Sequence, residues 1–366
     1  MGLILRKVDM SDFFKNMVKE LNDENTHLLS DGSNSAEFTG WIDTGSYILN
    51  ALVSGSLYGG IPNNKVVALA GEQATGKTFF ALGMMKSFLE SNAGAGTIYY
   101  DTEAAVTQEM MKSRGIDVHR VVVSEPETIQ GFRHNALQVL DRYTEHKKER
   151  PPMMMVLDSL GQLSTTKEME DSLDGKETRD MTKAQVIKAT FRTLGLKLAK
   201  AQVPMIITNH TYDVVGAYIP TKEMSGGSGL KYTASTILFL SKKRDKDVDK
   251  GEGNLIKVTA EKSRFTKEKK QVEVRLSYTH GLDRYYGLLD LAEQYNIVKK
   301  VSTRYEFPDG SKHFGKAINA SPEKFFTDDI MQRLERAAAE EYKYGPADDY
   351  VDDVDDEELV PELLNE

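Results

Sequence analysis

The 366-residue sequence contains no cysteine. This absence excludes disulfide bonds, thiolate metal ligands and cysteine nucleophiles, and it is typical of proteins that work in a reducing compartment. Long apolar runs are lacking too. No segment approaches the roughly 20 residues that a membrane-spanning helix needs, and the N-terminus has no signal-peptide pattern. We therefore expect a cytoplasmic protein without membrane attachment.

Positive charge is lacking at the C-terminal end. Residues 348–366 include ten Asp and Glu and no Lys or Arg, so the formal net charge of −9 becomes +1 when they are left out. The nearly neutral remainder carries basic clusters such as SKKRDKDVDK (241–250) and KSRFTKEKK (262–270). The acidic end is therefore either a solubilising tail or a competitor for a basic groove that binds polyanions.

Helical and apolar patterns alternate along most of the chain. Residues 1–22 have helical spacing, and a polar linker follows them. From about residue 38, apolar runs alternate with helical segments, which is typical of a parallel sheet covered on both faces. The expected strands are 65–70, 96–100, 121–123, 153–158 and 203–209, and the expected helices are 77–90, 106–113, 127–147 and 182–200.

The pattern changes in the last third of the chain. Apolar runs at 235–240, 254–262 and 271–278 have no helices between them, so we expect the sheet to end in antiparallel strands. A short helix is predicted over 287–298. A longer helix is predicted over 321–342, with Ser321 as its N-cap and Glu323 in its first turn. The predicted fold class is α/β.

A phosphate-binding motif follows the first expected strand. Gly71, Gly76, Lys77 and Thr78 form the pattern G-x-x-x-x-G-K-T between a strand and a helix. Backbone N–H groups of such a loop surround phosphate oxygens, the lysine reaches the β- and γ-phosphates, and the threonine holds Mg²⁺. The predicted nucleotide-binding residues are Gly71, Glu72, Gln73, Ala74, Thr75, Gly76, Lys77, Thr78 and Phe79.

Two carboxylates follow later strands. Asp158 ends MMMVLD, where it would help Thr78 hold Mg²⁺, directly or through water; the alternative is a turn residue. Glu103 follows IYYD, a strand that we expect beside the phosphate-loop strand, so its carboxylate would orient or deprotonate the attacking water. The alternative is a solvated loop glutamate, and Asp101 is a weaker candidate for the same role.

These elements, in this order, resemble the RecA-type recombinases. WIDTGSYILNALVSGSLYGGIPNNKVVALAGEQATGKT is similar to the family's phosphate-loop region, and MMMVLDSLGQLSTTKEMEDSL to its second metal-binding strand running into the first DNA-binding loop. RDMTKAQVIKATFRTL, PMIITNHTY, AEKSRFTKEK and GLDRYYGLLDLAEQYNIV look closest to the phage branch, the UvsX recombinases. The resemblance covers roughly residues 38–300.

The resemblance implies a division of the chain. Residues 1–37 would form an N-terminal helix and linker that contact the next protomer. Residues 38–280 would form a RecA-like P-loop ATPase core, with a mostly parallel sheet flanked by helices. Residues 281–345 would form a small C-terminal α/β region, and residues 346–366 an acidic, disordered tail.

The resemblance also implies two DNA-binding loops, at about 167–180 and 211–227. The composition of the second supports this prediction, because loops of such length are usually functional or disordered. Gly226, Gly227 and Gly229 would let backbone N–H groups approach phosphates at a helix start. Side chains that would neutralise phosphates or contact bases in the two loops are Lys167, Arg179, Tyr212, Tyr218, Ile219, Lys222 and Lys231.

Four further residues acquire roles through the resemblance. His210 matches a polar residue that contacts the γ-phosphate and leads into the second DNA loop, so it would act as a sensor. Lys262 and Arg264 match cations that reach the nucleotide of the adjacent protomer. Met110 stands where many members stack a tyrosine on adenine, and methionine provides only soft apolar contact there.

The sequence therefore predicts a DNA-dependent ATPase that uses ATP and Mg²⁺. It would form a helical homo-oligomeric filament on single-stranded DNA and pair it with homologous duplex DNA in recombination, repair and recombination-dependent replication. A single-strand-binding protein and a loading mediator are the partners implied, in the host cytoplasm if the gene is carried by a phage. The alternatives are a hexameric replicative helicase, a RecA-like mediator or regulatory paralogue, and a generic P-loop enzyme.

Overall fold

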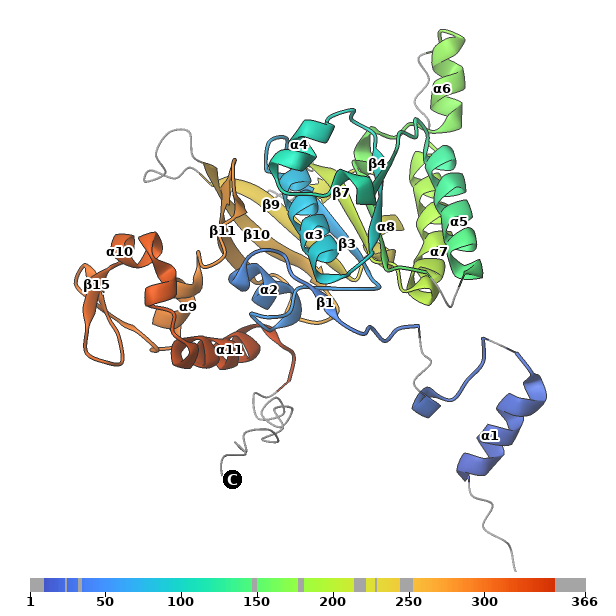
Figure 1. The fold of residues 1–366 in the computed structure, drawn as a ribbon. Helices are drawn as coiled ribbons and strands as arrows, with labels where there is room; N and C mark the ends of the chain where they lie inside the picture. The colour runs from blue at the N-terminus through green and yellow to red at the C-terminus, as the bar shows by residue number, and fades with distance from the viewer. Residues whose placement is uncertain are drawn as a thin grey trace, which may run out of the picture.

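The computed structural model describes residues 10–23, 25–31, 35–146, 150–176, 181–213, 222–227, 229–243 and 253–345. No helix in these ranges is both long enough and apolar enough to cross a membrane. Figure 1 shows a central sheet with helices on both faces, a small lobe built from the C-terminal elements, and α1 (Met10–Leu21) standing away from the body.

Within the part of the chain that the structure describes, the central sheet has ten strands. Its order is β12-β11-β10-β9-β3-β7-β6-β4-β5, and β8 pairs with the end of β7. Strands β3, β4, β5, β6, β7 and β9 run parallel to one another, whereas β10, β11 and β12 continue the sheet from β9 in antiparallel pairs, as predicted, and β8 pairs antiparallel with β7. Their bounds are β3 Val66–Gly71, β4 Gly96–Asp101, β5 Val121–Ser124, β6 Met153–Asp158, β7 Met205–Asp213, β8 Lys222–Met224, β9 Thr236–Lys243, β10 Gly253–Ser263, β11 Gln271–Ser277 and β12 Gly281–Leu282.

Both faces of the sheet carry apolar side chains, and helices cover both faces. β3 is buried along its whole length. Its Val67 and Leu69 belong to a hydrophobic cluster with α3, whereas Val66, Ala68 and Ala70 belong to a second cluster with α5 and α7. The helices of the core are α2 Tyr47–Ser54, α3 Lys77–Ser91, α4 Gln108–Ser113, α5 Ile129–Glu145, α6 Thr166–Leu173, α7 Lys183–Ala201 and α8 Gly229–Thr233. The 3-10 turns are η1 Leu29–Asp31, η2 Val118–Arg120 and η3 Leu160–Gln162. A separate two-stranded sheet pairs β1 Trp41–Ile42 with β2 Ile61–Pro62.

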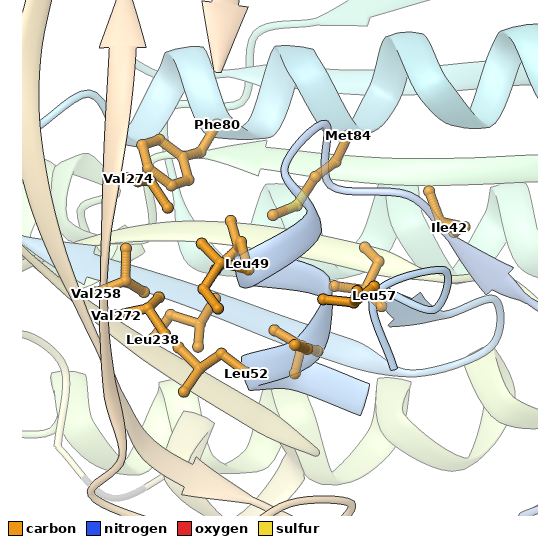
Figure 2. Close-up of a cluster of buried hydrophobic side chains, with 14 of the residues drawn as sticks. Ile42, Leu49, Leu52, Leu57, Phe80, Met84, Leu238, Val258, Val272 and Val274 are labelled. Atoms are coloured by element: carbon orange, nitrogen blue, oxygen red, sulfur yellow. The ribbon is translucent and has the colours of Figure 1, made fainter. Parts of the chain in front are cut away.

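The C-terminal lobe shares the first hydrophobic cluster with the core. In Figure 2, Leu49 and Leu52 of α2 lie between Phe80 and Met84 of α3 and valines of β10 and β11. The same cluster continues into the lobe through Leu288, Ile318 and Leu334. The elements of the lobe are α9 Leu288–Gln294, β13 Lys299–Val301, β14 Arg304–Glu306, β15 Lys312–Phe314, α10 Gly315–Ala320, η4 Pro322–Lys324 and α11 Asp328–Tyr342. Burial of one leucine side chain contributes about 2 kcal/mol to the free energy of folding. The shared cluster therefore stabilises the contact between the lobe and the core.

Three sequence predictions about the fold were incomplete or wrong. β4 does not neighbour β3, because β7 and β6 lie between them. The helix predicted over 321–342 begins only at Asp328, and Ser321 makes no side-chain capping hydrogen bond. A short 3-10 turn, Pro322–Lys324, precedes it instead, and the following Phe325 and Phe326 pack in the apolar cluster. The antiparallel sheet β13–β14–β15 was not predicted, since each strand has only three residues.

Candidate functional site

The loop between β3 and α3 has the shape of a phosphate-binding loop. Gly76 has a left-handed φ of 87° directly before α3, and a Cβ there would lie 2.5 Å from Leu276. A Cβ on Gly71 would lie 2.6 Å from the carbonyl oxygen of Leu240. Both positions therefore require glycine. No side chain caps the N-terminus of α3, so its first backbone N–H groups are free to bind an anion.

Lys77 lies buried inside this loop. Its Nζ donates hydrogen bonds to the carbonyl oxygens of Gly71, at 3.1 Å, and Glu72, at 2.8 Å. Burial lowers the pKa of Lys77, and the nearby carboxylates Glu103 and Asp158 partly offset that effect. The loop thus fixes the ammonium group of Lys77, the group that we predicted to bind phosphate oxygens.

A pocket of about 270 Å³ opens beside the loop. It brings together most of the predicted nucleotide residues with Glu103, Asp158 and His210. Met110 is not among its lining residues and instead packs against the hydrophobic cluster around α3. The pocket is lined by Gln73, Ala74, Gly76, Lys77, Thr78, Phe79, Glu103, Asp158, His210, Lys242, Asn254, Leu276 and Tyr278.

Four lining residues were missed in the sequence: Lys242 of β9, Asn254 of β10, Leu276 of β11 and Tyr278, which directly follows β11. Asn254 Nδ2 donates a hydrogen bond to Tyr278 Oη at 2.7 Å. The pairing of β9 with β3, which sets Leu240 beside Gly71, carries these residues to the pocket. That pairing is long-range, and no local motif indicates it.

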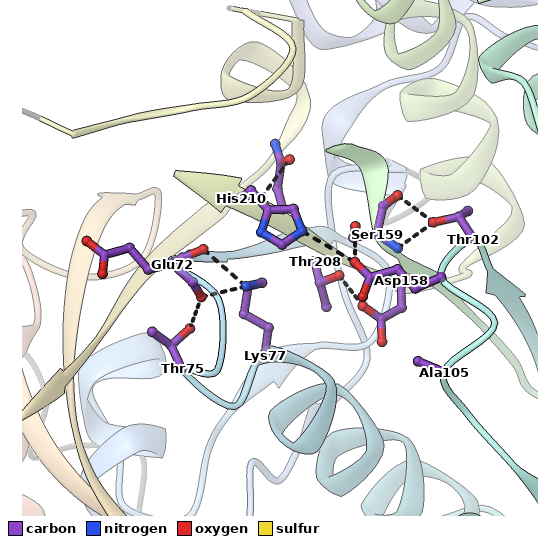
Figure 3. Close-up of polar contacts among 12 residues, drawn as sticks. Glu72, Thr75, Lys77, Thr102, Ala105, Asp158, Ser159, Thr208 and His210 are labelled. Atoms are coloured by element: carbon purple, nitrogen blue, oxygen red, sulfur yellow. Dashed lines mark hydrogen bonds and ion pairs between the residues drawn. The ribbon is translucent and has the colours of Figure 1, made fainter. Parts of the chain in front are cut away.

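Asp158 is held by its two neighbouring strands. Its Oδ2 accepts a hydrogen bond from Tyr99 Oη of β4 at 2.7 Å, and its Oδ1 accepts one from Thr208 Oγ1 of β7. Burial and the adjacent carboxylate raise the pKa of the Tyr99 phenol far above its ordinary value, so it remains a donor. The carboxylate itself is only 4% exposed, and Figure 3 shows it near Thr208 and Ser159.

The residues present suit Mg²⁺ with a nucleotide. Thr78 and Asp158 both line the pocket and offer hard oxygen atoms. Magnesium sites that use phosphate oxygens need only one or two protein ligands, because waters and phosphates complete the octahedron. Thr78 and Asp158 would therefore hold the ion between them and the phosphates.

Glu103, Ser159 and His210 form a second polar cluster at the pocket, and Figure 3 labels Ser159 and His210. Ser159 Oγ donates a hydrogen bond to Glu103 Oε1 at 2.6 Å, and His210 Nε2 lies 3.3 Å from the same oxygen. His210 reaches this position because β7 pairs with β3, with His210 beside Gly71. A carboxylate held by a hydroxyl and an imidazole is suited to orienting a water molecule.

Asp101 has a different environment from Glu103. It is 4% exposed, and its carboxylate accepts hydrogen bonds from the backbone N–H groups of Glu103, Ala105 and Val106 at 3.0, 3.4 and 3.2 Å. Asp101 therefore shapes the loop that presents Glu103, and the structure favours Glu103 over Asp101 as the group that faces a ligand.

The segment predicted as the first DNA-binding loop begins as a helix. Lys167 lies on α6, whose N-terminus is closed by a capping box between Thr165 and Glu168. Figure 1 shows α6 projecting from the body beside α5. Leu173, at its C-terminal end, is 86% exposed. Arg179 lies outside the described residues.

The second predicted DNA-binding loop begins at the end of β7, the strand that carries His210 of the pocket. β7 continues from His210 to the exposed Tyr212 and then to Asp213, and β8 returns with Lys222 opposite Asp213. Lys222 forms an ion pair with Glu72 of the phosphate loop. Nucleotide loop and predicted DNA loop are therefore in direct contact. Tyr218 and Ile219 lie outside the described residues.

The glycines of this loop lie against α7. Gly226 and Gly227 have left-handed φ values of 85° and 73°, and a Cβ on Gly226 would lie 2.6 Å from the Ile187 side chain. A Cβ on Gly229, the first residue of α8, would lie 2.6 Å from Lys188 Cα. Close packing on α7 thus explains these glycines without a ligand. Lys231 of α8 pairs with Glu223 at 3.9 Å.

Lys262 and Arg264 lie at the opposite edge of the sheet from the phosphate loop. Lys262 pairs with Ile237 near the start of β9, whereas Gly71 pairs with Leu240. The Lys262 ammonium donates hydrogen bonds to the carbonyl oxygens of Lys231 and Ala234 at 2.5 and 2.8 Å, and Arg264 Nη2 donates one to that of Tyr232 at 3.4 Å. These cations hold the C-terminal end of α8, and neither lines the pocket of its own chain.

The sequence is similar to recombination proteins. The chain is 32% identical over 253 residues to "Recombination and repair protein" of Enterobacteria phage T4, a match that spans 69% of this chain and 63% of the phage protein. It is 28% identical to "Protein RecA" of Clavibacter michiganensis subsp. michiganensis, over 74% of this chain and 71% of the relative, and 26% identical to "Protein RecA" of Streptomyces venezuelae, over 83% and 77%. The match to the phage protein thus covers just under two thirds of that protein.

The family comparison covers most of the chain. Residues 10–283 match the model of the RecA N-terminal domain. The match includes the phosphate loop, Glu103, Asp158, His210, both predicted DNA loops, Lys262 and Arg264. The predicted fold class and family are thus confirmed: the chain is a member of the RecA N-terminal domain family.

Proposed function

We propose that this chain is a DNA-dependent ATPase that forms a helical filament on single-stranded DNA and pairs that DNA with a homologous duplex. One observation carries the proposal. A single strand, β7, bears His210 in the nucleotide pocket and Tyr212 at the root of the second DNA loop, and Lys222 returns from that loop to Glu72. Loss of the γ-phosphate would therefore change the contacts of His210, which lies only two positions before Tyr212 of the predicted DNA loop.

The proposed chemistry divides among the residues of the pocket. Lys77 and the N-terminus of α3 would bind the phosphates of ATP, and Glu103 would orient the attacking water. When bound by Thr78 and Asp158, Mg²⁺ would neutralise charge on the phosphate oxygens. Phe79, Leu276 and Tyr278 line the pocket and offer apolar surface for a base. Tyr278 would make the aromatic contact with that base, because Met110 does not line the pocket.

The filament is supported by two kinds of surface. Lys262 and Arg264 do not line the pocket of their own chain, so they would complete the pocket of a neighbouring protomer, as arginine fingers do. In addition, α1 exposes one apolar side while the edge strand β5 exposes Val122 and Val123. Exposed apolar faces of this kind mark protein contacts; those of α1 are Phe13, Phe14, Met17 and Leu21.

The remaining assignments follow from the resemblance and stay proposals. They are the division at residues 37, 280 and 345, the acidic segment as a competitor of DNA, and a single-strand-binding protein and loading mediator as partners. Residues 346–366 lie outside the described part of the chain.

Electron microscopy of the chain with single-stranded DNA and a slowly hydrolysed ATP analogue tests the proposal. We expect open helical filaments, because a head-to-tail contact that does not close generates a helix. Closed rings would indicate the helicase alternative, and absence of assembly would favour the regulatory paralogue.

A further inference from the structure

Two adjacent tyrosines of β4 make equivalent contacts on opposite faces of the sheet. Tyr99 and Tyr100 are both fully buried. Tyr99 Oη donates to Asp158 Oδ2 at 2.7 Å, and Tyr100 Oη donates to Asn135 Oδ1 of α5 at 2.9 Å. Because side chains alternate along a strand, Tyr99 belongs to the hydrophobic cluster of α3, and Tyr100 to that of α5 and α7.

We propose that Tyr99 is a positioning residue for the metal-binding half of the nucleotide pocket. Its hydroxyl, together with that of Thr208, would hold the Asp158 carboxylate in one orientation at the pocket that Asp158 and Thr78 both line. This inference rests on the proposed function, in which Thr78 and Asp158 hold Mg²⁺.

The two hydroxyls restrain both oxygens of the carboxylate. Thr208 contacts Oδ1 from β7 and Tyr99 contacts Oδ2 from β4, the two strands that flank β6. Rotation of the carboxylate would leave two buried hydroxyl groups without an acceptor, which is unfavourable. An ionised carboxylate has about four lone-pair sites, so those not used by the two hydroxyls remain for the pocket.

Such restraint matters for this ion in particular. Mg²⁺ demands near-ideal octahedral geometry and gives up its waters reluctantly, so a carboxylate that turns freely is a poor partner for it. Groups that orient a metal-binding side chain typically change metal affinity 10- to 100-fold when removed.

The test is the Mg²⁺ dependence of nucleotide binding, measured with a fluorescent ADP analogue and without turnover. For Tyr99→Phe we expect the half-saturating Mg²⁺ concentration to rise by about 10-fold, with nucleotide binding in EDTA unchanged. Tyr100→Phe is the matched control, because it removes the same hydroxyl from the same strand. We expect it to melt at a lower temperature but to keep the Mg²⁺ dependence of the unaltered chain.

A second pair of variants serves if Tyr99→Phe does not fold. Thr208→Val removes the donor on the other oxygen and should raise the Mg²⁺ requirement, whereas Thr208→Ser retains the donor and should not. An unchanged Mg²⁺ requirement in Tyr99→Phe or in Thr208→Val overturns the inference. If the unaltered chain binds the analogue with no Mg²⁺ dependence, or not at all, the proposed function fails instead.

Discussion

In the proposed function, the two edges of the central sheet would carry different parts of one chemistry. At the carboxyl ends of β3, β4, β6 and β7, a single pocket collects Lys77, Glu103, Asp158 and His210. At the other edge, Lys262 and Arg264 donate hydrogen bonds to carbonyl oxygens at the end of α8. The first edge would bind a nucleotide within one chain, whereas the cations of the second edge do not line that pocket.

This difference indicates how assembly and catalysis would be linked. If the cations serve the pocket of a neighbour, hydrolysis requires two protomers and becomes a property of the filament. α8, which follows the second DNA loop, holds those cations, so DNA at the loop and ATP at the neighbouring pocket would act on one short helix. The following predictions test this division of roles.

The largest effect on ATP hydrolysis is expected from substitution of Lys262 and Arg264. The double variant Lys262→Ala/Arg264→Ala should lower DNA-dependent ATP hydrolysis by about 10³-fold or more, the usual contribution of a finger supplied from another subunit. Binding of ADP to the isolated protomer should persist, as measured by fluorescence titration. Lys269→Ala, which alters an exposed cation in the same β10–β11 connection, is the control and should leave both quantities unchanged. Loss of ADP binding in the double variant would contradict the division between the edges.

The next effect belongs to the pocket itself. Glu103→Gln should slow hydrolysis by about 10²- to 10⁴-fold, since the amide keeps the shape but cannot accept a proton. ATP should still support filaments, which electron microscopy would reveal. Glu109→Gln on α4 is the matched control. A hydrolysis rate close to that of the unaltered chain would return Glu103 to the role of a solvated loop residue.

A smaller effect is expected where β7 leaves the pocket. Tyr212→Ala should weaken binding of single-stranded DNA by roughly 1–3 kcal/mol, because stacking of a base on an exposed ring contributes that much. Tyr212→Phe keeps the ring and should bind nearly as well in a fluorescence-anisotropy titration. Equal affinity of the Ala and Phe variants would remove Tyr212 from the DNA-binding surface.

The smallest effect concerns the contact between the two loops. Glu72→Gln removes the partner of Lys222 and should raise affinity for single-stranded DNA in the absence of nucleotide. The change should not exceed about 5-fold, because exposed ion pairs contribute at most about 1 kcal/mol. Glu261→Gln, whose partner Lys269 lies in the β10–β11 connection, is the control. A fall in affinity would mean that Glu72 does not compete with DNA for Lys222.

Local patterns predicted much of this molecule from sequence. The phosphate loop was recognisable because glycine spacing, a preceding strand and a following helix are all contiguous in the chain. Asp158 was recognisable as the end of an apolar strand. The helix α6 was also readable in principle, since Thr165 and Glu168 have the spacing of a capping box, but the segment was assigned to a loop.

Long-range pairing limited the rest. The order of parallel strands is not encoded locally, so β4 was placed beside β3 although β7 and β6 separate them. The same limit hid Lys242, Asn254 and Tyr278, which reach the pocket only through the pairing of β9, β10 and β11. The hydrogen bond from Tyr99 to Asp158 joins residues 59 positions apart, and it depends on β4 and β6 being neighbours.

Mixing two inactive variants tests the central claim most directly. Lys77→Ala protomers lack a working phosphate loop but keep Lys262 and Arg264, whereas Lys262→Ala/Arg264→Ala protomers have the reverse defect. We predict that each variant alone hydrolyses little ATP with single-stranded DNA and that an equimolar mixture regains activity, because some pockets then receive both halves. A mixture that forms joint filaments in electron microscopy but stays inactive would contradict the claim that the two edges complete one site between protomers.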